Sequence, residues 1–204
     1  MNSDVRLKTG GRESPLAFTV PPEAGVSVMD KSEAEPDAYQ ATPIKVYLIA
    51  RISEDAHEWN NKICSQLKPP VDVFLPQNHN PVNMRHEKIP LKAYLTDIKA
   101  IEEAHMGLIL PEFGSDCSFE VGYFAHSEKP VIAFVDGQTE WLRNWMVKGG
   151  VDVVVTANRQ TYATIVNDHI LRHKRVLLVE TAGELNEVIR RVFEDAYISK
   201  TFRK

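Results

Sequence analysis

The sequence is poor in cysteine and contains no long apolar run. Its two cysteines, Cys64 and Cys117, show neither a metal-ligand spacing nor a disulfide framework, which fits a reducing compartment. No apolar run approaches the roughly 20 residues that span a membrane. The N-terminus lacks the basic and then apolar order of a secretory signal. We therefore expect a cytoplasmic protein without a membrane partner.

Basic clusters and the common nucleotide-binding motifs are also missing. The net charge is -4 and no group of lysines and arginines stands out, so we expect no nucleic-acid partner. No Gly-x-Gly-x-x-Gly follows an expected strand and no P-loop is present, so dinucleotide and nucleoside triphosphate binding lack their usual signals. Ser115 and Ser118 lack the Gly-x-Ser-x-Gly context of a hydrolase nucleophile.

The chain divides into a tail and one domain. Residues 1–43 contain five prolines and show no sustained periodicity, which is typical of a flexible tail. The alternative is an arm that packs on a partner subunit through residues 16–20. Residues 44–204 are long enough for one domain with a full hydrophobic core.

Short apolar runs alternate with helical patterns from Ile44 onward. The strands are expected at 44–50, 71–75, 106–110, 130–135, 151–156 and 175–179. The helices are expected after Ser53, at 91–104, from 114 onward, at 139–147, at 160–172 and at 183–196. This alternation predicts an α/β fold, a flavodoxin- or Rossmann-like doubly wound parallel sheet with helices on both faces. We expect five strands in this sheet and an extra C-terminal strand–helix element.

The fold class itself suggests where a ligand binds. In an open parallel sheet, ligands lie beyond the carboxyl ends of the strands, at the switch point in strand order. The segments expected there are residues 50–53, the polar loop 76–90, residues 111–120 and the residues from 136 onward.

Glu120 stands in one of these segments, where a strand is followed by a helix. Near a helix start, an acidic residue is often explained by the helix dipole alone. Asp116 lies four residues earlier and shares a helical face with Glu120 if the helix has begun, although it is equally explained as a cap. Two carboxylates at a switch point indicate an acid or base and a nucleophile. Gly122 follows closely and is interpreted as a position of close packing or ligand approach.

Two other reactive residue types have simpler explanations. Cys117 is interpreted as a buried small side chain rather than a nucleophile, although its place near a helix start leaves the second reading open. Taken alone, Asp97 is a solvated acid at the edge of a helix. The histidines His79, His86 and His105 show no metal-ligand spacing.

Four segments together resemble the nucleoside 2-deoxyribosyltransferase family, which includes related nucleoside and nucleotide N-glycosidases. Residues 46–50 (VYLIA) resemble its opening Tyr-x-x-Ala strand, and residues 94–101 (YLTDIKAI) its Asp-x-x-x-Ile helix. Residues 119–131, which contain FEVGYFA and KPV, resemble the segment with the nucleophilic Glu. Residues 144–149 (NWMVKG) resemble the segment that reaches a neighbouring subunit's active site.

The resemblance implies roles for particular residues. Glu120 would be the nucleophile, Asp97 or Asp116 would protonate the departing base, and Tyr47 would orient Glu120. The residues expected to bind substrate are Ala50, Arg51, Gln77, Gly114, Ser115, Asn144 and Met146. No cofactor and no metal is implied. A homodimer or higher homo-oligomer with active sites near the interface is implied.

The sequence also departs from the family's pattern. Some members carry an Asp six residues before the nucleophile, where this chain has Gly114, so the acid that acts on the base is placed differently. Arg51 follows the first strand and is interpreted either as a ligand of a 5′-phosphate or as a surface residue.

Three functions follow as hypotheses. The first is a transferase that exchanges bases on (deoxy)nucleosides by a retaining double displacement. The second is a nucleoside or nucleoside 5′-monophosphate N-glycosidase in which water is the acceptor. The third is a non-catalytic nucleotide-binding module.

Overall fold

The structure is a computed structural model that describes residues 43–79, 89–110, 113–137 and 143–198. All of these belong to the second of the two units, Met1–Tyr39 and Gln40–Lys204, into which the chain divides. The predicted tail at 1–43 lies, except for Pro43, outside the described residues. Its flexibility and the arm at 16–20 stay predictions.

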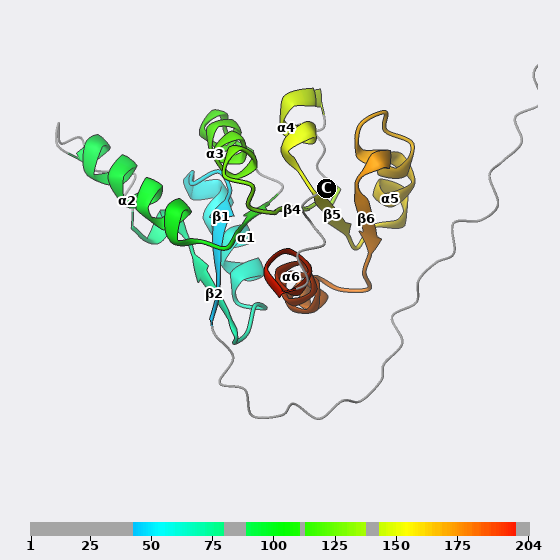
Figure 1. The fold of residues 1–204 in the computed structure, drawn as a ribbon, viewed down its shortest axis with the longest axis horizontal. Coiled ribbons are helices and arrows are strands. Elements are labelled where there is room, and N and C mark those ends of the chain that lie inside the picture. Colours follow the sequence, from blue (N-terminus) through cyan, green and yellow to red (C-terminus); the bar gives the residue numbers. More distant parts are fainter. Residues whose placement is uncertain (1–42, 80–88, 111–112, 138–142, 199–204) are drawn as a thin grey trace, which may run out of the picture. The chain divides into compact units, whose positions relative to one another are not determined.

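The described residues form one parallel sheet of six strands in the order β2-β1-β3-β4-β5-β6 (Figure 1). The strands are β1 (Ile44–Ile49), β2 (Val71–Phe74), β3 (Met106–Ile109), β4 (Val131–Phe134), β5 (Val153–Thr156) and β6 (Arg175–Leu178). The predicted doubly wound α/β fold is confirmed. The expected count of five strands needs one correction, because β6 pairs with β5 and is the edge strand of the same sheet.

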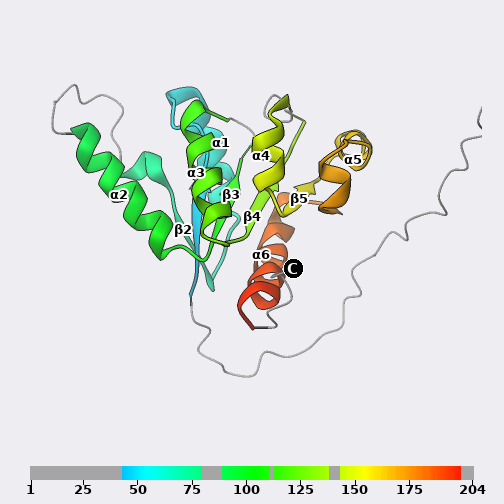
Figure 2. The ribbon, with the colours of Figure 1, turned by 45° about the horizontal axis from the view of Figure 1, so that its top comes forward.

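Six α-helices connect and follow these strands within the described ranges. They are α1 (Glu54–Cys64), α2 (Ile89–Glu103), α3 (Ser115–His126), α4 (Trp145–Gly150), α5 (Arg159–Val166) and α6 (Leu185–Phe193). Helices α1 and α6 pack on one face of the sheet, and α2 to α5 pack on the other (Figure 2). The chain passes from β1 to β2 in one direction along the sheet and from β2 to β3 and onward in the other. Because crossovers between parallel strands are right-handed, this reversal places the later connecting helices on the opposite face from α1.

Two predicted helices have different bounds in the structure. Helix α4 begins at Trp145 because Oδ1 of Asn144 accepts hydrogen bonds from the backbone N–H groups of Met146 and Val147. The earlier part of the prediction, 139–142, lies outside the described residues. Helix α5 ends at Val166, because the chain turns before a short 3₁₀ helix at Leu171–His173.

The central strands are apolar because helices cover both of their faces. Alternate residues of β1 point to opposite layers: Val46 and Leu48 join α1 and α6, whereas Tyr47 and Ile49 join α2 to α5. All four side chains are at most 1% exposed. A continuous apolar run, rather than alternation, is the expected sequence of such a strand.

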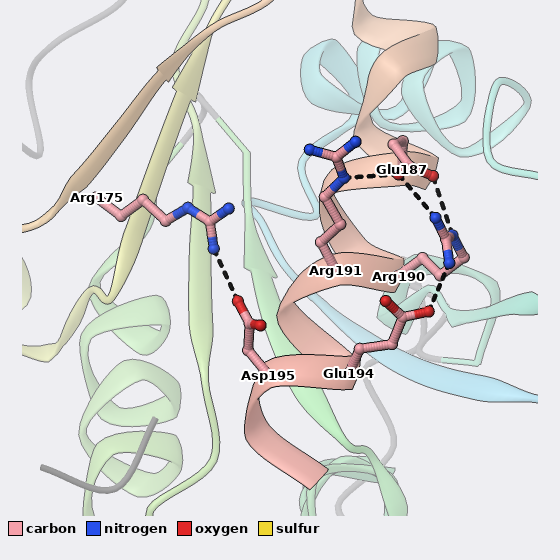
Figure 3. A network of polar contacts seen from close by, with 6 residues as sticks. All are labelled: Arg175, Glu187, Arg190, Arg191, Glu194 and Asp195. Carbon is pink, nitrogen blue, oxygen red and sulfur yellow. Dashed lines mark hydrogen bonds and ion pairs between the residues drawn. The ribbon is translucent and has the colours of Figure 1, made fainter. Parts of the chain in front are cut away.

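Helix α6 separates its apolar and charged residues. Leu185, Val188, Ile189 and Val192 are buried against the sheet. On the other side, Glu187 accepts hydrogen bonds from Arg190 and Arg191, and Arg175 of β6 contacts Asp195 just after the helix (Figure 3). Exposed pairs of this kind contribute little to stability, so the buried stripe holds α6 in place.

Gly107 of β3 makes room for the packing next to β1. A β-carbon added at Gly107 would lie 2.7 Å from Cδ1 of Ile49 and 3.2 Å from Cδ2 of Phe124. Gly122 of α3 is exposed and has no such neighbour within 4 Å. The interpretation of Gly122 as a position of close packing is therefore wrong within the described part of the chain.

The two glycines predict opposite effects of the same substitution. Gly107→Ala should lower the free energy of unfolding by about 1–3 kcal/mol, because the added methyl overpacks the core. Gly122→Ala should raise it by up to about 1 kcal/mol, because alanine is favoured in an exposed helix. Urea denaturation of both variants measures these changes. Equal effects in the two variants would contradict the packing described here.

Candidate active site

A pocket lies at the switch point of the sheet. Strand β1 has β2 on one side and β3 on the other, so the chain changes direction next to the carboxyl end of β1. The pocket is lined by residues that follow β1 and β2 and by residues of α2 and α3. These are Ala50, Ile52, Pro76, Tyr94, Asp97, Ile98, Ile101, Asp116, Cys117, Phe119 and Glu120.

Glu120 is held in this pocket by a tyrosine from the core of the sheet. The hydroxyl of Tyr47 donates a hydrogen bond of 2.6 Å to Oε1 of Glu120. Tyr47 lies on β1 and is fully buried, whereas Glu120 lies on α3 and is half-buried. The bond therefore joins a strand to the helix that covers it, and it orients one carboxylate oxygen.

Aromatic packing fixes the position of Tyr47. Its ring stacks on Phe74 of β2 with centroids 5.5 Å apart, and it packs at a tilt against Phe124 of α3 at 6.0 Å. Gly107 stands opposite Tyr47 on the neighbouring strand, and its missing side chain leaves space for Phe124. With neighbours on several sides, the tyrosine hydroxyl has little freedom to leave Glu120.

The environment of Glu120 makes its carboxyl hard to ionise. The pKa of Glu120 is raised to about 7: burial is the main cause and the negative charges of Asp97 and Asp116 add to it, while the hydrogen bond from Tyr47 lowers it. Burial, followed by the charge of Glu120, raises the pKa of Tyr47 far above its usual value. Tyr47 therefore stays protonated and remains a donor when Glu120 is ionised.

Both aspartates named from the sequence line the pocket with Glu120. Asp97 is half-buried on α2, and Asp116 is exposed in the first turn of α3. The hydroxyl of Ser115 donates a hydrogen bond of 3.0 Å to Oδ1 of Asp116. The first turn is also where the helix dipole favours an acid, so the alternative reading of Asp116 stands beside its place in the pocket.

Only one of the seven expected substrate-binding residues, Ala50, is part of the pocket lining. Gly114 and Ser115 are the N-cap and first residue of α3, next to the lining. Arg51 is exposed and forms an ion pair of 3.7 Å with Asp55 of α1.

The segment of Asn144 and Met146 lies apart from the pocket of its own chain. The side chain of Asn144 caps α4, as described above. Met146 is 82% exposed on that helix. Neither residue is part of the pocket lining. The contact with a neighbouring subunit's active site that the resemblance implied stays a prediction.

Gln77 is not part of the pocket lining but forms a hydrogen bond that holds two segments near the pocket together. Its Oε1 accepts a hydrogen bond of 2.9 Å from Nδ2 of Asn60, which also donates to the carbonyl of Arg51 at 3.0 Å. Asn60 is completely buried on α1. It thus ties together the segments after β1 and β2, which supply Ala50, Ile52 and Pro76 to the pocket.

The sequence interpretation missed part of the lining. The lining residues that were not named individually are apolar or aromatic, and three of them stand in segments expected at the site. They are Ile52, Pro76 and Phe119 in those segments, and Tyr94, Ile98 and Ile101 outside them. Spacing could have found two of them, because Tyr94 is three residues from Asp97, and Phe119 three from Asp116, so each pair shares a helix face. Cys117 also lines the pocket but is buried, and burial raises its pKa to about 12. It is a thiol at neutral pH, which agrees with its structural interpretation.

Two kinds of feature are missing from the described residues. Their His, Cys, Asp and Glu side chains form no group of three or more that could hold a metal ion. None of their helices combines the length and apolar character of a membrane span.

The hydrogen bond between Tyr47 and Glu120 can be tested by titration. Tyr47→Phe should raise the pKa of Glu120 by about one unit, because the ionised carboxylate loses a donor. NMR titration of the side-chain carboxyl carbons measures this pKa in the parent and the variant.

The chain offers a matched control for this experiment. The hydroxyl of Tyr123 donates a hydrogen bond of 3.2 Å to the exposed Glu102. Tyr123→Phe should leave the titration of Glu120 unchanged. If Tyr47→Phe left the pKa of Glu120 unchanged, the hydrogen bond between Tyr47 and Glu120 would be contradicted.

Comparisons with known proteins identify no family. No protein-family model and no curated protein matches the chain. A solved 2-deoxyribosyltransferase from Bacillus psychrosaccharolyticus is similar, with 19% identity and a TM-score of 0.47 over 54% of this chain and 84% of that chain. A conserved protein from Enterococcus faecalis V583 is similar with 16% identity and a TM-score of 0.45 over 72% of this chain and 97% of that chain. At these values neither likeness assigns an activity to this chain.

Proposed function

We propose that this chain is an enzyme that transfers the sugar of a (deoxy)nucleoside from one base to another. The observation that carries the proposal is the half-buried carboxylate of Glu120, oriented by Tyr47 in a switch-point pocket that also contains Asp97 and Asp116. The resemblance of the four sequence segments supports the same chemistry.

Glu120 acts as the nucleophile in the first step. One carboxylate oxygen of Glu120 forms a bond to the anomeric carbon of the sugar, and the bond from that carbon to the base nitrogen breaks. The electron pair leaves with the base, which receives a proton from Asp97 or Asp116, whichever of the two carries a proton when the substrate binds; that side chain thereby becomes a carboxylate. The transition state resembles an oxocarbenium ion, which the negative charges around it stabilise.

The second step reverses the first with another acceptor. A nitrogen of the incoming base attacks the anomeric carbon, and the aspartate that gave up its proton in the first step accepts the proton of this nitrogen. The bond to Glu120 breaks and the carboxylate is regenerated. Two displacements on opposite faces retain the configuration of the sugar.

Tyr47 prepares Glu120 for this role. Its hydroxyl opposes the burial that would otherwise keep Glu120 protonated. The contact also fixes the carboxylate, so that less motion is frozen when the substrate binds. Tyr47 itself contributes no proton, because its pKa is raised.

Two alternatives use the same pocket. In an N-glycosidase, water replaces the second base, and the residues of the first step are unchanged. Arg51 would favour a 5′-phosphate in that case, although it contacts Asp55 in this structure. A binding module would hold the ligand without breaking the glycosidic bond.

Product analysis with Glu120→Gln tests the proposal. The parent, incubated with a panel of nucleosides and 5′-monophosphates, should form a new nucleoside only when a second free base is added. Glu120→Gln should lose this activity by on the order of a thousandfold or more, because a neutral amide is a poor nucleophile. Chromatography of the products measures both.

Glu102→Gln is the matched control, because Glu102 also accepts from a tyrosine but lies outside the pocket lining. It should keep the parent's rate. Release of free base without an acceptor would favour the N-glycosidase. No turnover in the parent, or equal turnover in Glu120→Gln, would refute the catalytic role of Glu120.

The pH dependence follows from the pKa of Glu120. The nucleophile must be ionised, and its pKa is raised to about 7 in the folded protein. The value of kcat/KM should therefore fall as the pH is lowered through about 7, where an ordinary glutamate would stay active to more acidic pH. A pH series of initial rates measures this. A kcat/KM that stays constant down to pH values near 5, or that rises there, would be inconsistent with an ionised Glu120.

A further inference from the structure

Two large rings at the pocket are exposed. Tyr94 of α2 is 53% exposed and Phe119 of α3 is 55% exposed, and both line the pocket. Exposed aromatic rings keep unfavourable contact with water unless a ligand or partner covers them. Neither ring has a part in the displacement steps at Glu120.

Each ring is paired with a carboxylate on its own helix. Tyr94 precedes Asp97 by three residues on α2, and Phe119 follows Asp116 by three residues on α3. Side chains three apart share a helix face, and all four line the pocket. The two helices therefore each bring a flat apolar surface and a hydrogen-bond acceptor to one cavity.

The ring of Phe119 is held by a second aromatic ring on the same helix. Its ring packs against Tyr123 one turn later, with centroids 6.1 Å apart. The hydroxyl of Tyr123 reaches Glu102 of α2. This chain of contacts links α3 to α2 and limits the motion of the Phe119 ring, so less freedom is lost when a ligand stacks on it.

We infer that Tyr94 and Phe119 are the base-binding residues of the pocket, which stack on the planar ring of a purine or pyrimidine. This inference rests on the proposed function and names the part of the substrate that these residues recognise. The faces of a base are apolar and its edge carries N–H donors, which suit the rings and the carboxylates of Asp97 and Asp116 respectively. Stacking is tolerant of base identity, because every base has a π-face. We therefore expect both purines and pyrimidines to bind.

The alternative occupant is a protein surface. Leu91 and Leu95 of α2 are also exposed, at 62% and 55%, but neither lines the pocket. A protein partner would cover these leucines as well as Tyr94, whereas a base would contact only the rings at the pocket. Leu95 is adjacent to Tyr94 and equally exposed, which makes it the matched control.

Calorimetric titration of the full chain with free adenine and free cytosine tests the inference without requiring turnover. Tyr94→Ala and Phe119→Ala should each weaken binding by about 5- to 150-fold, the effect typical of losing one stacked ring. Tyr94→Phe keeps the ring and should bind as the parent does, and so should Leu95→Ala. Because all three positions are exposed, unfolding is not expected, and circular dichroism checks it.

Several results would overturn the inference. One is that neither base binds to the parent, and another is that Tyr94→Ala and Phe119→Ala bind the bases as the parent does. A third is that Leu95→Ala loses as much base affinity as these two variants and also has a lower sedimentation coefficient. The last would show that copies of this chain meet at this face. Ring-dependent base binding without any glycosyl transfer would refute the proposed function alone, and transfer without ring-dependent binding would refute this inference alone.

Discussion

The hydrogen bond between Tyr47 and Glu120 is the contact on which the rest of the site depends. It connects a residue at the centre of the sheet to a carboxylate at the pocket, over 2.6 Å. Tyr47 can reach Glu120 only because β1 turns this side chain toward α3 and because Gly107 leaves space beside it for Phe124. The packing of the sheet thereby determines where the carboxylate lies.

The burial of Glu120 at this contact has a cost for the fold. A buried carboxylate near two others is difficult to ionise, and the pKa of Glu120 is raised accordingly. The folded protein binds the proton of Glu120 more tightly than the unfolded chain does. The contribution of Glu120 to stability is therefore full below its unfolded pKa and is lost as the pH rises through about 7. The proposed role of Glu120 as a nucleophile gives a reason why a carboxylate lies in this pocket in spite of that cost.

The sequence predicts the strands of the sheet better than the loops and helix starts. The central strands β1, β3, β4 and β5 are buried apolar runs, and the sequence located them together with the less buried β2 and β6. The switch point indicated the place of the pocket. Glu120, Asp97 and Asp116 line one pocket and Tyr47 contacts Glu120, because regular elements fix the direction of these side chains. Their roles stay predictions.

Loop residues and helix starts were less predictable. The direction of Gln77 depends on a partner on α1, Asn60, which no local pattern reveals. The start of α4 depends on the cap formed by Asn144. Tyr94 and Phe119 were not named from the sequence, because their spacing from Asp97 and Asp116 indicates a shared helix face but does not show that both faces line one pocket.

The most direct test of the account is a search for the covalent intermediate. The protein would be mixed with a 2′-deoxyribonucleoside in the absence of a second base, quenched in acid, digested and sequenced by mass spectrometry. The account predicts a deoxyribosyl ester on Glu120, absent from Glu120→Gln and removed when a second base is added before the quench. Turnover without any adduct in the parent, or an adduct on another residue, would contradict it.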